Sequence, residues 1–100
     1  MIDSGGFDDA IRCCNKVLEI DPKNADAMFI AGKAYASKGN KDAAIEMFLR
    51  ALSIDKDNTN IMYVLAKTYI GIGDIDNAVI WLNKILEYEP RRTDIWIMMG

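Results

Sequence analysis

GNKDAAI, at residues 39–45, recurs in altered form as GGFDDAI at residues 5–11 and as GDIDNAV at residues 73–79. Each segment begins with glycine, ends on an alanine followed by an aliphatic residue, and starts 34 residues after the previous one. When residues 25–58 are laid over residues 59–92 without a gap, seven positions are identical. A fixed period of this length indicates a repeat architecture in which each unit is one supersecondary element.

The apolar spacing within each unit predicts two amphipathic helices. Residues 25–38 place apolar groups at the i, i+3, i+4 and i+7 positions of one helical face, and residues 42–54 carry a second such face. Period-2 alternation is not sustained anywhere, so no strand is predicted. The sequence therefore predicts an all-α fold in which successive helix pairs stack, because a single pair cannot bury both of its apolar faces.

Polar residues and glycines mark the expected helix ends. Asn24 and Asn58 precede the first helix of each unit, where an asparagine side chain can cap the free amide groups. Gly39 and Gly73 stand where these helices should end and the chain must turn. We expect Gly6 to lie in a comparable turn. Gly32 lies within a helix, where the lack of a side chain allows a second helix to approach closely.

The composition excludes several classes of function. The chain has 100 residues, a net charge of −3 and a pI near 4.8, which argues against nucleic acid as a main partner. It contains no histidine, so imidazole catalysis and His metal sites are excluded. The glycines form no phosphate loop and no nucleophile–base pair is visible. We therefore expect no catalytic residue, no metal and no cofactor.

The cellular location is predicted from what the sequence lacks. The longest apolar run, residues 61–66, is far shorter than the roughly 20 residues of a membrane span. The first residues are acidic and do not resemble a secretory signal. Cys13 and Cys14 are adjacent and cannot staple distant parts of the chain, so we interpret them as small apolar side chains in a reducing compartment. The sequence predicts a cytoplasmic protein without a membrane partner.

The 34-residue unit resembles the tetratricopeptide repeat. The positions that carry the resemblance are Met28, Ala31, Gly32, Tyr35, Gly39, Ala44, Phe48, Ala51 and Lys56 in one unit, and Met62, Leu65, Ala66, Tyr69, Gly73, Ala78, Leu82, Ile85 and Pro90 in the next. The resemblance implies a right-handed superhelix, or α-solenoid, of antiparallel helix pairs. It divides the chain into the second helix of a truncated repeat (1–24), two complete repeats (25–58 and 59–92) and the start of a further repeat (93–100). The related pentatricopeptide family, which binds RNA, has a unit of usually 35 residues and favours a basic surface, so it fits less well.

The resemblance also implies where a ligand would bind. The first helix of each tetratricopeptide pair lines a concave groove that often receives a peptide. The positions that the resemblance places on this side are Asp26, Phe29, Ile30 and Lys33 in one unit, and Asn60, Tyr63, Val64, Lys67 and Ile70 in the next. Stacking would give an aromatic row beside a lysine row, which could hold a peptide by apolar contact while the lysines meet a carboxylate. The clamp with which one subfamily grips acidic chaperone tails is not present, because its positions here are mostly apolar.

We expect a non-catalytic module that binds a protein or peptide, as a scaffold or adaptor. Two alternatives stay open. The array could belong to a larger enzyme or regulator, in which it recruits substrate or docks domains, because a fold does not fix a function. It could also assemble head-to-tail with itself, since neither end has a polar capping helix. The residues predicted for such self-association are Ile11, Cys14, Ile95, Trp96 and Met99.

A short polar turn is expected between the last two predicted helices. Glu87, Glu89, Arg91 and Arg92 cluster beside Pro90, and we interpret all four charged side chains as solvated.

Overall fold

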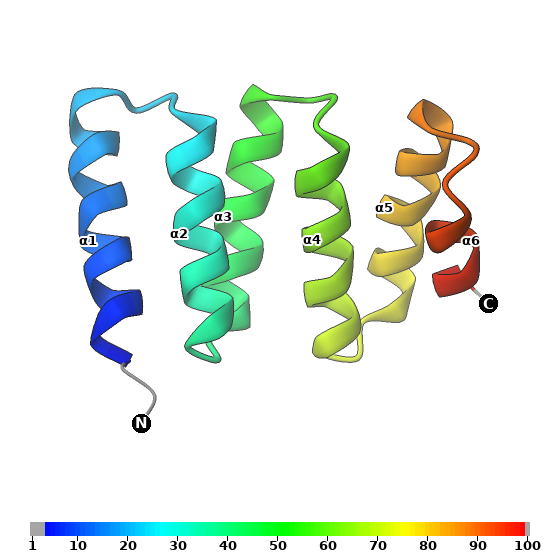
Figure 1. Ribbon diagram of the computed structural model, residues 1–100, viewed down its shortest axis with the longest axis horizontal. Coiled ribbons are helices and arrows are strands. Elements are labelled where there is room, and N and C mark those ends of the chain that lie inside the picture. The colour runs from blue at the N-terminus through cyan, green and yellow to red at the C-terminus, as the bar shows by residue number, and fades with distance from the viewer. Residues whose placement is uncertain (1–3, 100) are drawn as a thin grey trace. The chain divides into compact units, whose positions relative to one another are not determined.

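The computed structural model describes residues 4–99, in two compact units that divide between Lys56 and Asp57 (Figure 1). The first unit contains helices α1 (Ser4–Ile20), α2 (Ala25–Ser37) and α3 (Lys41–Ile54). The second contains α4 (Thr59–Gly71), α5 (Ile75–Tyr88) and α6 (Thr93–Met99). All regular elements of the described residues are helices, and successive helices within each unit run antiparallel. The predicted all-α class of repeated helix pairs is confirmed.

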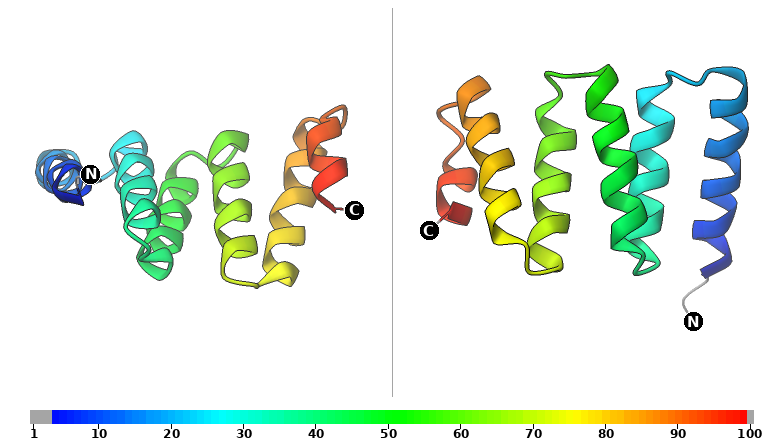
Figure 2. Two further views of the ribbon diagram at one scale, coloured as in Figure 1. Left: turned by 60° about the horizontal axis from the view of Figure 1, so that its bottom comes forward. Right: turned by 180° about the vertical axis from the view of Figure 1, so that it is seen from behind.

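Within the first unit, α2 packs against both of its neighbours (Figure 2). Cys14 of α1 and Ala27 and Ala31 of α2 form a buried cluster that Leu18, Tyr35 and Met47 partly cover. Small side chains dominate this cluster, so the helix backbones can approach one another. In the second unit α5 packs against α4 and α6, and the side chains of Leu65, Leu82 and Ile95 are almost completely buried.

The predicted caps are confirmed at the first helix of each pair. The Asn24 side chain accepts a hydrogen bond from the Ala27 amide at 2.9 Å, and Asn58 accepts one from the Ile61 amide at 3.2 Å. Each bond satisfies an amide group that the first turn of a helix leaves without an intrahelical partner. The caps fix the points at which α2 and α4 begin.

Gly39 and Gly73 end the first helices, as predicted. Their φ angles are +90° and +85°, a region that residues with a Cβ atom rarely adopt. The next amide in each turn, of Asn40 or Asp74, donates to the carbonyl of Tyr35 or Tyr69 at 2.9 Å. The two turns are therefore built in the same way. The prediction of a turn at Gly6 is wrong, because Gly6 lies within the first turn of α1, where a helix can begin on small residues.

The close helix contact predicted at Gly32 is confirmed. A Cβ atom on Gly32 would lie only 2.6 Å from Cε1 of Phe48 on α3. Phe48 itself is fully buried. The phenyl ring therefore occupies the space that any larger residue at position 32 would need.

Candidate functional site

The exposed side of α2 carries a charged and an aromatic group in contact with each other. The Lys33 ammonium lies 5.3 Å from the centre of the Phe29 ring, within the range of a cation–π interaction. Phe29 is half-buried, and its ring centre lies 5.7 Å from that of Phe48 at an interplanar angle of 53°. The ring is thus held from below by the core and covered from above by the lysine.

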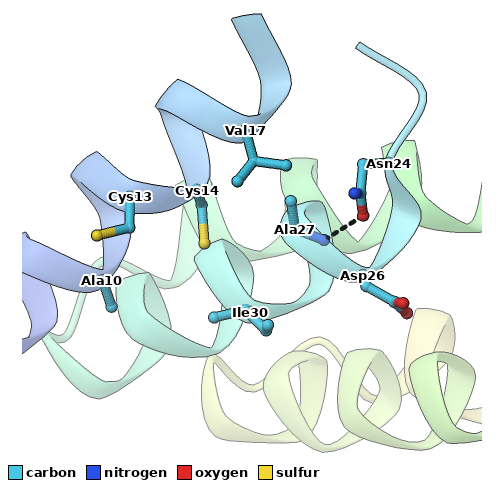
Figure 3. Close-up of a pocket in the computed structure, with 8 residues that line it drawn as sticks. All are labelled: Ala10, Cys13, Cys14, Val17, Asn24, Asp26, Ala27 and Ile30. Carbon is cyan, nitrogen blue, oxygen red and sulfur yellow. Dashed lines mark hydrogen bonds between the residues drawn. The ribbon is translucent and has the colours of Figure 1, made fainter. Parts of the chain in front are cut away.

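Two further predicted residues lie on the same helix. Asp26 is exposed in the first turn, and the Ile30 side chain is 51% exposed. Both border an open pocket of about 340 Å³ between α1 and α2 (Figure 3). The four predicted residues of α2 therefore combine one acidic, one basic and two apolar side chains on a single helix.

The α4 helix repeats this arrangement. The Lys67 ammonium lies 5.4 Å from the centre of the Tyr63 ring, at positions 34 residues beyond Lys33 and Phe29. Asn60 and Ile70 are exposed, while Val64 is half-buried. The structure thus brings together the predicted residues of each unit on one helix of that unit.

Neither lysine has an acidic partner. Among residues 4–99, no carboxylate forms an ion pair with Lys33 or Lys67. Most charged contacts elsewhere are local, such as Arg50 with Glu46 at 3.1 Å on α3. The two ammonium groups over the aromatic rings are therefore available to an external anion.

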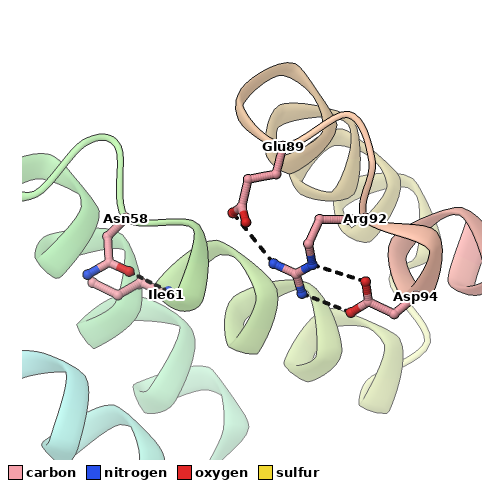
Figure 4. Close-up of polar contacts among 5 residues, drawn as sticks. All are labelled: Asn58, Ile61, Glu89, Arg92 and Asp94. Carbon is pink, nitrogen blue, oxygen red and sulfur yellow. Dashed lines mark hydrogen bonds and ion pairs between the residues drawn. The ribbon is translucent and has the colours of Figure 1, made fainter.

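Arg92 is the residue that the sequence analysis misjudged. It is only half-exposed rather than fully solvated, and its guanidinium carbon lies 5.6 Å from the centre of the Tyr63 ring. It donates two hydrogen bonds to Asp94, at 3.0 and 2.8 Å, and pairs with Glu89 at 3.5 Å (Figure 4). The hydrogen bonds from Arg92 hold the pKa of Asp94 below its ordinary value. Only the spacing of Arg92 and Asp94, two residues apart with opposite charge, hinted at this contact in the sequence.

The residues predicted for self-association differ in their accessibility. Ile11 and Cys14 are buried on α1, and Ile95 is completely buried on α6. Trp96 is 55% exposed, although its indole N–H donates to the Pro90 carbonyl at 3.1 Å. The side chain of Met99 lies outside the described residues.

The cysteines remain unpaired thiols. Cys13 is exposed and Cys14 is buried, and burial raises the pKa of the Cys14 thiol. Within the described part of the chain, no cluster of three or more histidine, cysteine or acidic residues could hold a metal ion. No helix of that part has the length and apolar character needed to cross a bilayer.

Comparison with known proteins places this geometry in a family. The family model described as anaphase-promoting complex, cyclosome, subunit 3 matches residues 3–85. No curated protein sequence is significantly similar to the chain.

Solved structures share the fold over almost the whole chain. A TPR protein of the thermophile Thermus thermophilus has a TM-score of 0.85 and 26% identity, over 95% of this chain and 48% of that protein. The first TPR of Spaghetti, solved with an HSP90 peptide, has a TM-score of 0.85 and 20% identity, over 95% of this chain and 75% of that one. The O-GlcNAc transferase of Thermobaculum terrenum has a TM-score of 0.81 and 25% identity, over 96% of this chain and 18% of the enzyme. The chain thus spans about half the length of the Thermus protein.

Proposed function

We propose a function from this membership: the chain belongs to the family described as anaphase-promoting complex, cyclosome, subunit 3, a family of tetratricopeptide-repeat type, and acts as a non-catalytic module that binds a protein or peptide. A fold that occurs with a bound peptide in Spaghetti supports this class of ligand. The repeats that would carry the binding surface are residues 25–58 and 59–92. The two free thiols favour a reducing compartment, so we propose the cytoplasm as the location.

The observation that carries the proposal is the lysine placed over an aromatic ring on the first helix of both repeats. The same pair, Phe29 with Lys33 and Tyr63 with Lys67, lies on α2 and on α4. An ammonium group that rests on a ring and lacks a carboxylate partner can accept an acidic group from a ligand. The aromatic and aliphatic side chains beside it supply apolar contact. The proposed ligand is therefore a peptide segment with both acidic and apolar residues.

Capture from source lysate by the immobilised chain tests this proposal. We expect the double variant Lys33→Glu/Lys67→Glu to lose proteins that the wild type retains, because each substitution turns attraction into repulsion. Lys84→Glu is the matched control: Lys84 also lies over an aromatic ring, 5.6 Å from the centre of Trp81, but on α5, the second helix of its pair. Equal losses with Lys84→Glu, or none with the double variant, would contradict the proposal.

A second candidate is a recruiting segment within a larger enzyme. The similarity to the O-GlcNAc transferase of Thermobaculum terrenum favours it, because the matched region is a small part of that enzyme. The length of the natural reading frame separates the candidates. A further catalytic domain after Gly100 would support this role, and a frame that holds repeats alone would refute it.

Head-to-tail self-association is the third candidate. It is favoured by the exposed Trp96 and Ile97 on α6, the latter 78% exposed, and by the partly exposed Val17 on α1. Because Ile11, Cys14 and Ile95 are already buried, the contact would rely on these outer side chains. Sedimentation velocity over a concentration series tests it, and a strict monomer at high micromolar concentration would remove it.

A further inference from the structure

The pocket between α1 and α2 is apolar along most of its wall (Figure 3). Ala10, Cys13, Cys14 and Val17 line it from α1, and Ala27 and Ile30 line it from α2. Val17 and Ile30 are 40% and 51% exposed, so part of the lining is open to an incoming group. At about 340 Å³ the pocket has room for a large side chain.

The pocket exists because α1 lacks bulk that the other second helices possess. At the positions equivalent to Cys13 and Cys14, α3 carries Met47 and Phe48, and α5 carries Trp81 and Leu82. Two small thiols therefore stand where the chain elsewhere places two large side chains. The missing volume is a local property of α1 that the repeat pattern itself does not require.

A negative charge stands at one end of the pocket. Asp26 lies at the start of α2, and Figure 3 shows its carboxylate directed outward from the rim. Among residues 4–99 no cation forms an ion pair with it. The equivalent position of α4 is the neutral Asn60, so this charge belongs to the pocket of the first unit alone.

We propose that this pocket binds a large apolar side chain of a partner protein, with an adjacent lysine or arginine of the partner paired to Asp26. The inference rests on the proposed function and defines the chemistry of part of its ligand. Asp26 and Lys33 are seven residues apart on α2, which separates them by about 10 Å along the helix axis. The partner segment would therefore present a basic, an apolar and an acidic group in that order along α2.

Two dipeptides of opposite charge test the pocket directly. N-acetyl-Trp-Arg-amide and N-acetyl-Trp-Glu-amide are titrated into the isotope-labelled chain, and amide chemical shifts are followed by NMR. We expect shifts centred on Val17, Ala27 and Ile30. The arginine peptide should bind about two- to fivefold more tightly, which is the range of an exposed ion pair. Asp26→Asn should remove this preference, whereas Asp42→Asn, at the same position of α3, should leave it intact.

Filling the pocket provides the second test. Cys13→Trp places at an exposed position the residue that the chain carries at Trp81, and it should weaken both dipeptides severalfold. Asn15→Trp, also exposed on α1 but outside the pocket, is the control. Alkylation of Cys13 by N-ethylmaleimide in the folded protein fills the same space if the tryptophan variant does not fold; the buried Cys14 is protected from the reagent.

The outcomes separate this inference from the proposed function. Shifts elsewhere, no binding, equal affinity for both dipeptides, or full binding after the pocket is filled would overturn the inference. If protein capture still depends on Lys33 and Lys67 in that case, the proposed function stands without it. If the dipeptides bind as expected while capture ignores both lysines, the pocket stands and the proposed lysine surface fails.

Discussion

The two complete helix pairs solve one packing problem in different ways. In the first pair, α2 contributes Gly32 and α3 contributes Phe48, and a Cβ atom on the glycine would lie 2.6 Å from the ring. In the second pair, the equivalent positions hold Ala66 on α4 and Leu82 on α5, both buried. The alanine has the Cβ atom that position 32 cannot accept, and the smaller leucine replaces the phenyl ring.

This difference shows that the pattern preserves the combined volume of the two residues rather than their identities. Protein interiors are packed as densely as organic crystals, so a gain on one helix must be matched by a loss on the other. A substitution on one side alone should therefore be costly, and a paired exchange should be tolerated.

The largest effect is expected from Gly32→Leu. Four added carbons meet the buried Phe48 ring, and overpacking of this kind costs typically about 1–3 kcal/mol of unfolding free energy or more. Urea denaturation gives the measurement. Gly6→Leu is the matched control, since a Cβ atom on Gly6 meets nothing within 4 Å although the residue also lies in a helix. Comparable losses at the two glycines would show that the Gly32 contact is not critical.

A paired exchange sharpens the comparison at smaller cost. Gly32→Ala alone should destabilise, because its Cβ atom is too close to Phe48. Adding Phe48→Leu recreates the alanine–leucine pair of α4 and α5 and should recover part of the loss. A double-mutant cycle should give a favourable coupling of about 0.5–3 kcal/mol. Strict additivity of the two single losses would refute volume exchange.

The sequence predicted most of the fold, because its signals are local and repeated. Helix periodicity, the Asn24 and Asn58 caps and the positive-φ turns at Gly39 and Gly73 all act within a few residues, so no knowledge of distant contacts was needed. Gly6 was misplaced because its glycine lacks the preceding helix that gives Gly39 its meaning as a stop.

The binding surface was less predictable than the fold. The spacing of Phe29 and Lys33 by four residues places them on one helical face, so their contact could be expected. The contact of Arg92 with Tyr63 joins residues far apart in the sequence, and no local pattern announces it. The pocket beside Cys13 likewise depends on what two helices jointly leave empty.

The second difference between the pairs lies in how the aromatic ring is supported. Phe29 rests on Phe48, whereas Tyr63 is also approached by Arg92. We expect Arg92→Ala to lower the unfolding free energy by about 0.5–1 kcal/mol, the size of an exposed cation–π contact. Urea denaturation at low and high salt measures it, with Arg91→Ala, an exposed neighbour, as the control. Equal effects of the two variants would mean that Tyr63 gains nothing from Arg92.

The smallest expected effect is a pH dependence confined to the second unit. Hydrogen bonds from Arg92 lower the pKa of Asp94 in the folded chain relative to its ordinary value. A carboxyl group with a depressed folded pKa stabilises the fold above its unfolded pKa, and this contribution disappears as the pH falls through the folded value. The stability difference between wild type and Asp94→Asn should therefore be constant near neutral pH and shrink below about pH 4. Because Asp94 is exposed, solvent screens the interaction and the difference stays small.

Asp76→Asn separates this effect from that of the helix terminus. Asp76 lies in the first turn of α5 as Asp94 lies in the first turn of α6, and both carboxylates favour the positive end of their helix. Within the described residues only Asp94 of the two also pairs with an arginine. Urea midpoints measured from neutral to acidic pH should change more for Asp94→Asn than for Asp76→Asn, and added salt should narrow the gap. If the two variants follow the same curve, the Arg92 contact contributes nothing beyond the helix end; if the Asp94 difference grows as the pH falls, the sign of the linkage is wrong.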